Sequence, residues 1–442
     1  MRAKRIIKLL CITLVFLLAC GVLMAEKKEE EKTLVIWWWG ETELQGLTGW
    51  LDETISIFEE ENPNVTIEAT LQDTVNVFSD FPTASAAGEP PDLQFSWNGI
   101  YAMEWVWLGH VEPLDGLIPQ NELKHMVATS LSSFEGQQYR AGWYLFGHGW
   151  VYNKELFQKA GVPQRLTPPE TWDEWLQVCQ MLKDAGITPL SLGAKDQLLG
   201  DWLISLFMVQ QLDSPSDPLK LCIGDLRWDD PRYYEHWVRI KELWDKGYIN
   251  DDINSLDLYQ GQNLFTTGEA AMTIAVGTII PALEKELGPE NIGVMKTPTF
   301  GVGKLADKDV TYIQGILVSS QSKNKELAAE FIRLMHRQDR YNALWDDLGA
   351  IPADDRFDSA KIDDPVIKET WSWFENSTIY VGDTIPWAIL GDWAYAGCQE
   401  LFSGMKSPKE LGEKGQRLAE QWREQDPDSL QNYKDWLSGM SE

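Results

Sequence analysis

Apolar and polar positions follow one another along this chain in the order typical of an α/β protein. Residues 33–39 form an unbroken β-branched and aromatic run that stops at Gly40, which predicts a fully buried, central strand. Apolar residues at helical spacing follow over 47–58, and Asn62-Pro63 ends them. Residues 65–69 then alternate as a second strand. Strand, helix and strand in this order predict a parallel sheet with right-handed crossovers.

Later segments continue the same pattern. Residues 84–88 predict the end of a small-residue helix, and residues 90–95 lead into another strand. Thr171 and Glu174 have the spacing of a capping box that opens a helix, and residues 326–337 predict a further amphipathic helix. The chain of 442 residues is too long for one hydrophobic core. We therefore expect two α/β lobes.

The first residues have the order of an export signal. Basic residues between positions 2 and 8 precede an apolar run over 12–18 and then Ala19-Cys20. This run is shorter than the roughly 20 residues that a membrane-spanning helix needs. Residues 17–20 resemble the bacterial lipobox, which predicts a signal peptide over 1–19, lipidation of Cys20, and an anchor and tether over 20–32. Cleavage after Ala25 is the alternative, and both interpretations predict an exported, periplasmic or cell-surface protein.

The chain is strongly acidic. It carries 38 Lys and Arg against 68 Asp and Glu, a net charge of -30, and loss of residues 1–19 leaves 34 basic residues and a net charge of -34. A polyanion gains nothing from counterion release on a phosphate backbone, so nucleic acid is excluded as a partner. Membrane contact is expected only through the lipid anchor. The 22 Trp residues are an excess that composition alone does not explain.

Cofactor motifs are not evident in the sequence. The five His residues have no metal-binding spacing, and no phosphate-binding Gly-x-x-x-x-Gly-Lys-Ser/Thr loop occurs, so we expect no metal and no cofactor. Cys179, Cys222 and Cys398 lie far apart along the chain and form no Cys-x-x-Cys pair. Buried free thiols are the simplest interpretation, although one bridge is possible.

Several ordered segments together resemble the family 1 extracellular solute-binding proteins, the sugar-binding components of bacterial ABC importers. The resemblance runs over about residues 33–425, and its segments are 33–40, 50–65, 84–92, 134–139, 151–157, 160–162, 169–175, 265–272, 323–332 and 349–352. It implies a type II-like periplasmic-binding-protein fold, with a hinge and a ligand cleft between the lobes. It also implies a monomer that is not an enzyme and that delivers its ligand to permease subunits.

The resemblance also implies the lobe limits. The chain should cross between lobes near residues 145, 288 and 350. The N-terminal lobe then comprises residues 33–145 and 289–349. The C-terminal lobe comprises residues 146–288 and 350–442.

The candidate binding residues are aromatic and polar side chains at strand ends and at positions that match the family. Indole rings cover the apolar faces of sugars, and carboxylates and amides bond the hydroxyl groups. These candidates are Trp39, Glu41, Trp97, Asn98, Trp143, Trp202, Trp387 and Trp393. Many relatives carry a stacking Trp after the position of Met272, but this chain has Gly277-Thr278 there. Either another tryptophan provides that contact, or the sugar is held in a different way.

Two other functions stay open at this point. A secreted glycoside hydrolase would also be acidic and rich in Trp, and would use two carboxylates. A binding protein for a different solute, such as a polyol phosphate, would share the fold, although a net charge of -34 disfavours an anionic ligand.

Overall fold

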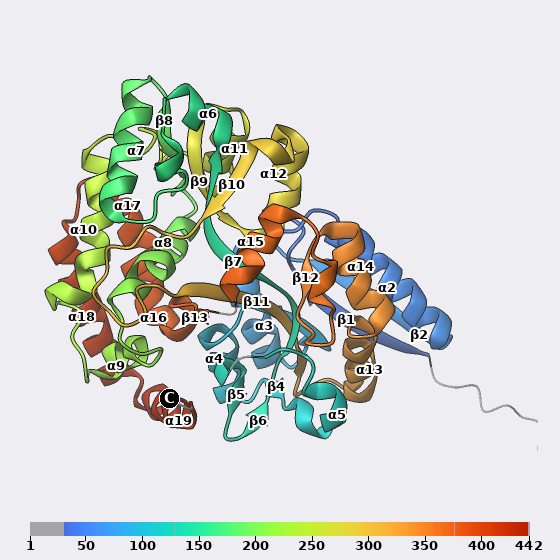
Figure 1. The fold of residues 1–442 in the computed structure, drawn as a ribbon. Helices are drawn as coiled ribbons and strands as arrows, with labels where there is room; N and C mark the ends of the chain where they lie inside the picture. The colour runs from blue at the N-terminus through green and yellow to red at the C-terminus, as the bar shows by residue number, and fades with distance from the viewer. Residues whose placement is uncertain (1–30, 129, 375, 441–442) are drawn as a thin grey trace, which may run out of the picture.

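The computed structural model describes residues 31–128, 130–374 and 376–440. Its main sheet has the strand order β2-β1-β3-β11-β7-β9-β8 (Figure 1). The predicted signal peptide, Cys20 and most of the predicted tether lie outside the described residues. The strands of this path, in spatial order, are β2 (Val65–Leu71), β1 (Lys32–Trp38), β3 (Leu93–Ser96), β11 (Asp309–Ser319), β7 (Ala141–Asn153), β9 (Ala270–Val276) and β8 (Thr188–Ser191).

Strand β7 joins two groups of strands. Its first half pairs antiparallel with β11, from Ala141 to Gly147, and its second half pairs antiparallel with β9, from His148 to Tyr152. All of its residues are buried. A strand that belongs to both groups makes two sheets continuous, so β7 is the first connection between two lobes.

The remaining short strands extend each group. Strand β10 (Ile292–Met295) pairs with the second half of β7, whereas β12 (Ile351–Pro352) pairs with its first half and β13 (Ser377–Ile379) pairs with β11. By strand pairing, residues 292–295 therefore go with the second sheet, and residues 351–352 and 377–379 with the first. The sequence assigned these three segments the other way round. The lobe limits as a whole stay a prediction.

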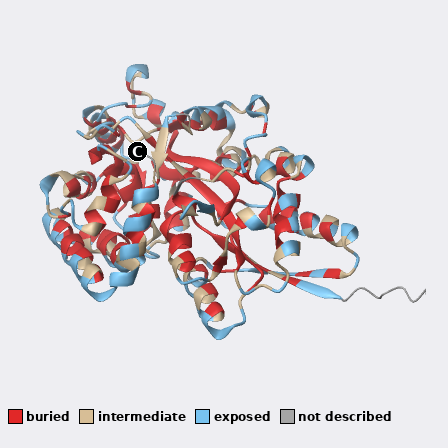
Figure 2. Cartoon of the chain, turned by 90° about the horizontal axis from the view of Figure 1, so that it is seen from below, coloured by how far each residue is buried: buried red, intermediate tan, exposed pale blue. Residues whose placement is uncertain are grey.

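Helices cover both sheets. In the first lobe, α2 (Leu47–Glu61) packs with α13 (Lys325–Met335) and α14 (Gln338–Leu348), and α3 (Thr74–Ala87) packs on β3. In the second lobe, α7 (Trp172–Asp184) and α11 (Leu258–Thr266) cover the strands, and α8 (Leu198–Met208), α10 (Pro231–Asp245) and α18 (Pro408–Gln425) form a helical layer beside them. Figure 2 shows most of the strand length buried and exposed faces on the surrounding helices.

The local sequence signals are confirmed. Helix α2 runs to Glu61 and is capped by Asn62, as the Asn-Pro pair predicts. The capping box is present: the Glu174 backbone N–H donates to Thr171 Oγ1 at 3.4 Å, and the Glu174 carboxylate accepts from the Thr171 N–H at 3.1 Å. Helices α3 and α13 occupy the segments that were predicted to be helical.

The prediction of a fully buried, central first strand is wrong. Strand β1 pairs with β2 and β3 but is second from the edge of the sheet. Its side chains alternate between the core and a partly covered face, so that Trp38 is buried and Trp37 is only half-buried. A strand near a sheet edge is covered less completely on one face than a central strand.

Candidate functional site

A cleft lined by aromatic rings lies where the two lobes meet. Trp39 follows β1 directly and Trp97 follows β3 directly, and because these strands are parallel, both residues lie at the same edge of the sheet. Helices α8 and α11 provide the facing wall. The lining residues are Trp39, Glu43, Thr74, Phe78, Trp97, Tyr101, Leu198, Asp201, Trp202, Leu258, Tyr259, Tyr312 and Tyr395. We call this the aromatic cleft.

Stacked rings nearly fill the aromatic cleft. Phe78 lies parallel to Trp97 on one side, with ring centroids 4.7 Å apart, and parallel to Trp387 on the other side, at 4.9 Å. Trp39 packs against Trp97 at 5.3 Å and donates from its indole N–H to Thr74 Oγ1 at 3.0 Å. The remaining cavity is about 30 Å³, which is room for one or two water molecules. The lobes are therefore closed on each other in this structure.

Two buried carboxyl groups line the aromatic cleft. Glu43 comes from the segment after β1 and accepts hydrogen bonds on Oε1 from Tyr144 (3.1 Å) and Gln314 (2.9 Å). Asp201 comes from α8, and its Oδ1 has no hydrogen-bond partner in the structure. Burial raises the pKa of each group to about 7, against the opposing effect of their hydroxyl and amide neighbours. Both carboxyl groups can therefore donate or accept a hydrogen bond near neutral pH.

Two glycines allow the backbone to approach these groups. Gly40, with φ of 134°, lies between β1 and the Glu43 segment, and a Cβ there would lie 2.7 Å from the Tyr144 hydroxyl. A Cβ on Gly382 would lie 1.8 Å from Asp201 Oδ1. A side chain at position 40 would press on the Tyr144 hydroxyl that donates to Glu43, and one at position 382 would overlap the Asp201 carboxyl group itself, so glycine suits both positions.

A buried polar layer lies beside the aromatic cleft. Arg140 is completely buried and donates to the backbone carbonyls of Ser96 and Ile313 and to Asn98 Oδ1. Asn98 Oδ1 also accepts from the Ser132 hydroxyl at 2.8 Å. Burial lowers the pKa of Arg140 to about 10, and the charge of Asp383 opposes this shift. These contacts fix the loop that carries Trp97.

Comparison with known protein families shows to which family the chain belongs. The sequence profile of the bacterial extracellular solute-binding proteins matches residues 38–337, more than half of the chain. The chain belongs to this family. This solute-binding protein is 24% identical to a multiple sugar-binding protein of Streptococcus mutans over 298 residues, which are 64% of this chain and 67% of the relative.

Solved structures have the same fold. A chitin oligosaccharide binding protein superposes with a TM-score of 0.81 at 22% identity, over 88% of this chain and 98% of the other. A maltose/maltodextrin-binding domain from Bdellovibrio bacteriovorus, bound to maltotriose, superposes with a TM-score of 0.70 at 18% identity, over 89% and 100%. The solute-binding protein therefore has the two-lobe α/β fold of periplasmic sugar-binding proteins. No helix in the described part of the chain is both long and apolar enough to cross a membrane.

Four candidates from the sequence meet at the aromatic cleft of this solute-binding protein. Trp39, Trp97 and Trp202 line it, and Trp387, which is 39% exposed, lies at its edge against Phe78. Trp202 comes from the second lobe and touches His148 at 4.6 Å between ring centroids. Burial lowers the pKa of His148 to about 3, so this neighbour is uncharged at neutral pH.

The other four candidates do not line the aromatic cleft. Glu41 accepts hydrogen bonds from the backbone N–H groups of Gly46 and Thr48 at the start of α2. Burial would raise its pKa, but these bonds outweigh that effect and lower it. Asn98 belongs to the polar layer already described. Trp143 and Trp393 are buried inside the first and second lobe, against Trp50 at 5.7 Å and Trp228 at 4.5 Å respectively.

Sequence reasoning missed the residues that face these tryptophans, above all Glu43, Phe78, Asp201 and Tyr259. A signal for Asp201 exists, because Leu198, Asp201 and Trp202 lie at i, i+3 and i+4 and share one face of α8. No comparable signal separates Glu43 from Glu41, since both carboxylates follow the same strand.

Proposed function

We propose that this protein is the sugar-binding component of an ABC importer and binds a neutral oligosaccharide in the aromatic cleft. The observation that carries the proposal is the convergence of indole and phenol rings from both lobes around two buried carboxyl groups. Rings cover the apolar faces of pyranoses and carboxyl groups bond their hydroxyls. The similarity to proteins named for binding multiple sugars, chitin oligosaccharide and maltose/maltodextrin supports a sugar as the ligand class.

The charge of the lining supports a neutral ligand. None of the described residues that line the aromatic cleft is Lys, Arg or His, whereas two are acidic. A phosphate or carboxylate on the ligand would enter beside Glu43 and Asp201 without a cation to pair with. A polyol phosphate is therefore a poor ligand for this site.

Binding requires the lobes to separate. A cavity of about 30 Å³ does not hold a pyranose ring, and Phe78 lies between Trp97 and Trp387, where a sugar ring of similar thickness would stack. The ligand then stabilises the closed form through its contacts with both walls. Trp202 and Tyr259 provide the second-lobe contacts in place of the stacking ring that the sequence lacks after Met272.

The same proposal includes export, anchoring and delivery. Cys20 carries the lipid that tethers the folded lobes to the membrane, and the closed, sugar-loaded form docks on permease subunits. The support for anchoring is the sequence of residues 17–20 alone. Mass spectrometry of the protein from a bacterial expression host tests it: a diacylated N-terminal Cys20 is expected, and an unmodified N-terminus after Ala25 would remove the anchor from the proposal.

Calorimetry tests the binding function. Titration with neutral oligosaccharides of two to six units should give one site per chain for at least one sugar, whereas glycerol 3-phosphate and galacturonic acid should give no heat. Absence of binding across the neutral panel would contradict the proposal. Release of reducing ends during the titration would instead assign Glu43 and Asp201 to a glycoside hydrolase.

A further inference from the structure

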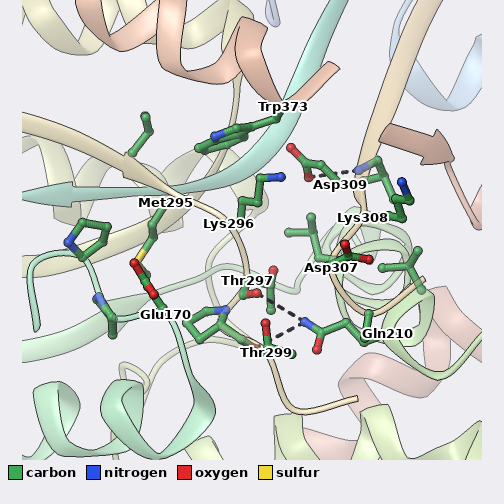
Figure 3. A pocket seen from close by; sticks show the side chains of 18 of the residues that line it. Glu170, Gln210, Met295, Lys296, Thr297, Thr299, Asp307, Lys308, Asp309 and Trp373 are labelled. Carbon is green, nitrogen blue, oxygen red and sulfur yellow. Dashed lines mark hydrogen bonds between the residues drawn. The ribbon is translucent and has the colours of Figure 1, made fainter. Parts of the chain in front are cut away.

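A second cavity lies beside the connection between β10 and β11, away from the aromatic cleft. It has a volume of about 330 Å³, within the usual range for small-molecule sites, and shares no lining residue with the aromatic cleft. Its walls come from the 296–308 connection, the start of β11, helix α15 (Pro365–Phe374) and the segment after α8. We call it the hinge pocket (Figure 3).

One wall of the hinge pocket holds a buried carboxyl group with an open hydrogen-bonding position. Asp309 is 4% exposed, its Oδ1 accepts from the Val310 N–H at 2.9 Å, and its Oδ2 has no hydrogen-bond partner. Asp309 lies at the start of β11, where β13 pairs with it, so the backbone holds the carboxyl group in place. An unpaired buried oxygen of this kind is costly unless a ligand satisfies it.

A cation faces the same space. The Lys296 ammonium lies 5.9 Å from the centroid of the Trp373 ring, and Figure 3 shows Lys296, Trp373 and Asp309 around one opening. Among the described residues, Lys296 and Asp309 are not within ion-pair distance of each other. The charge of Lys296 nevertheless acts on Asp309: burial raises the pKa of that carboxyl group to about 7, and the Lys296 ammonium opposes this shift. The second lysine in the lining, Lys308, donates a hydrogen bond from its ammonium to Asn376 Oδ1. The hinge pocket thus presents the Lys296 ammonium and one buried carboxyl group, Asp309, whereas its other carboxylates, Glu170, Asp307 and Glu369, are exposed.

The opposite wall is rigid. Gln210 is buried, donates from its amide to the carbonyls of Thr297 and Pro298 at 3.3 Å each, and accepts from the backbone N–H groups of Phe300 (2.8 Å) and Gly301 (3.1 Å). These bonds, some of which Figure 3 marks, tie the connecting segment to the second lobe. Hydrogen bonds therefore hold this wall of the cavity in place.

From this arrangement we propose that the hinge pocket binds a small zwitterion, a molecule with one ammonium and one carboxylate group such as an α-amino acid. Its ammonium pairs with Asp309 Oδ2 and its carboxylate pairs with Lys296, so both charges are satisfied at once. A neutral polyol would give neither group a charged hydrogen-bond partner. An anion would pair with Lys296 but meet Asp309, together with Glu170, Asp307 and Glu369 in the same lining.

Occupancy of the hinge pocket affects the aromatic cleft, and this step rests on the proposed function. Asp309 and Val310 belong to the first sheet, whereas Gln210 and Met295 belong to the second lobe. Separation of the lobes at the aromatic cleft changes the distance between these walls. A zwitterion that contacts both walls stabilises the closed form, and by linkage it raises the affinity for sugar.

The test is calorimetry of the sugar-free protein with glycine, L-serine, L-proline and L-glutamate, with methylamine, acetate and glycerol as probes that lack one or both charges. At least one amino acid should bind at one site with a Kd of about 1 mM or tighter, and the single-charge probes should bind at least about tenfold more weakly. Asp309→Asn and Lys296→Met should each weaken amino-acid binding about tenfold or more. Asp307→Asn is the matched control, since Asp307 lines the same pocket but is exposed, and it should change the affinity little.

Two results would overturn the hinge-pocket proposal: no amino acid binds, or binding is unchanged in both Asp309→Asn and Lys296→Met. Lys296 is only half-buried, so its variant keeps the test valid if Asp309→Asn does not fold. Sugar affinity measured with and without saturating amino acid tests the coupling separately. An unchanged sugar affinity would overturn the coupling but not the amino-acid site. Absence of sugar binding in a protein that still binds an amino acid would contradict the proposed function and not the hinge pocket.

Discussion

The rings of Phe78 and Trp387 lie nearly parallel, with an interplanar angle of 19° and centroids 4.9 Å apart. Phe78 belongs to α3 of the first lobe, and Trp387 begins α16 (Trp387–Leu390), which packs with the helices of the second lobe. With Trp97 on the other face of Phe78, the three rings form a stack that closes the aromatic cleft. The closed form is thus held by the same kind of contact that a sugar ring would make.

Trp202→Ala should weaken sugar binding by about 10- to 100-fold, because it removes one aromatic wall worth roughly 1–3 kcal/mol. Trp202 is half-buried, so the melting temperature should change little. Trp244→Ala is the matched control: Trp244 is also half-buried but packs on Phe402, away from the aromatic cleft. Calorimetry on the two variants checks this, and equal affinities would remove Trp202 from the site.

Trp393→Ala should lower stability and spare sugar affinity. Trp393 is 1% exposed and packs against Trp228 at 4.5 Å and Trp237 at 5.8 Å, in the π-helical segment η9 (Gly391–Ala396). Loss of such a ring leaves a cavity that costs about 3–5 kcal/mol. Urea unfolding should show this loss, and calorimetry well below the melting temperature should show near wild-type affinity. An affinity loss in the folded variant would return Trp393 to the binding site.

Because of Glu43, the free energy of unfolding should fall as the pH rises. Burial raises its pKa from 4.5 to about 7, so the folded protein binds this proton more tightly than the unfolded chain. The resulting stabilisation is complete below about pH 4.5 and is lost as the pH rises through about 7. Relative to Glu43→Gln, wild type should therefore lose about 2–3 kcal/mol of unfolding free energy between about pH 5 and about pH 8.

The control for this pH profile is Glu41→Gln. The pKa of Glu41 is lowered, so its contribution is present above the ordinary pKa and is lost as the pH falls. The two variants should deviate from wild type with opposite slopes in urea unfolding at a series of pH values. A wild-type curve parallel to that of Glu43→Gln would show that Glu43 is ionised throughout.

Gly382→Ala should disrupt the carboxyl group of Asp201. The new methyl group would overlap Asp201 Oδ1, and the backbone N–H of Gly382 is held by the Ser205 hydroxyl at 3.2 Å. We expect a loss of about 1–3 kcal/mol of stability together with weaker sugar binding. Asp201→Ala in the same chain should restore stability but not affinity. Gly49→Ala in α2, where a Cβ meets nothing within 4 Å, should leave both unchanged or slightly raise stability.

The residues of the candidate site that could be predicted from the sequence are those that directly follow a strand. Trp39 and Trp97 could be placed at the aromatic cleft because each directly follows a strand, and parallel strands end at one edge of a sheet. Trp143 and Trp393 could not be sorted in this way, since their burial depends on neighbours far away in the sequence, such as Trp50 and Trp228. The position of Phe78 depends equally on tertiary contact with Trp387, more than 300 residues later.

The turn after β1 explains why Glu43, and not the predicted Glu41, lines the aromatic cleft. Gly40 adopts a φ of 134°, and the chain then folds back so that the Glu41 carboxylate reaches the backbone of Gly46 and Thr48. Glu43 consequently points inward to Tyr144 and Gln314. A sequence pattern gives the order of these carboxylates but not the direction of the turn that separates them.

A crystal structure of the protein with its tightest-binding neutral oligosaccharide tests the central claim most directly. We predict a sugar ring stacked on Trp97 or Trp202, with hydroxyl groups within about 3 Å of Glu43 and Asp201. Phe78 should no longer lie between Trp97 and Trp387. A sugar bound away from these residues, with the stack of Trp97, Phe78 and Trp387 intact, would contradict the account.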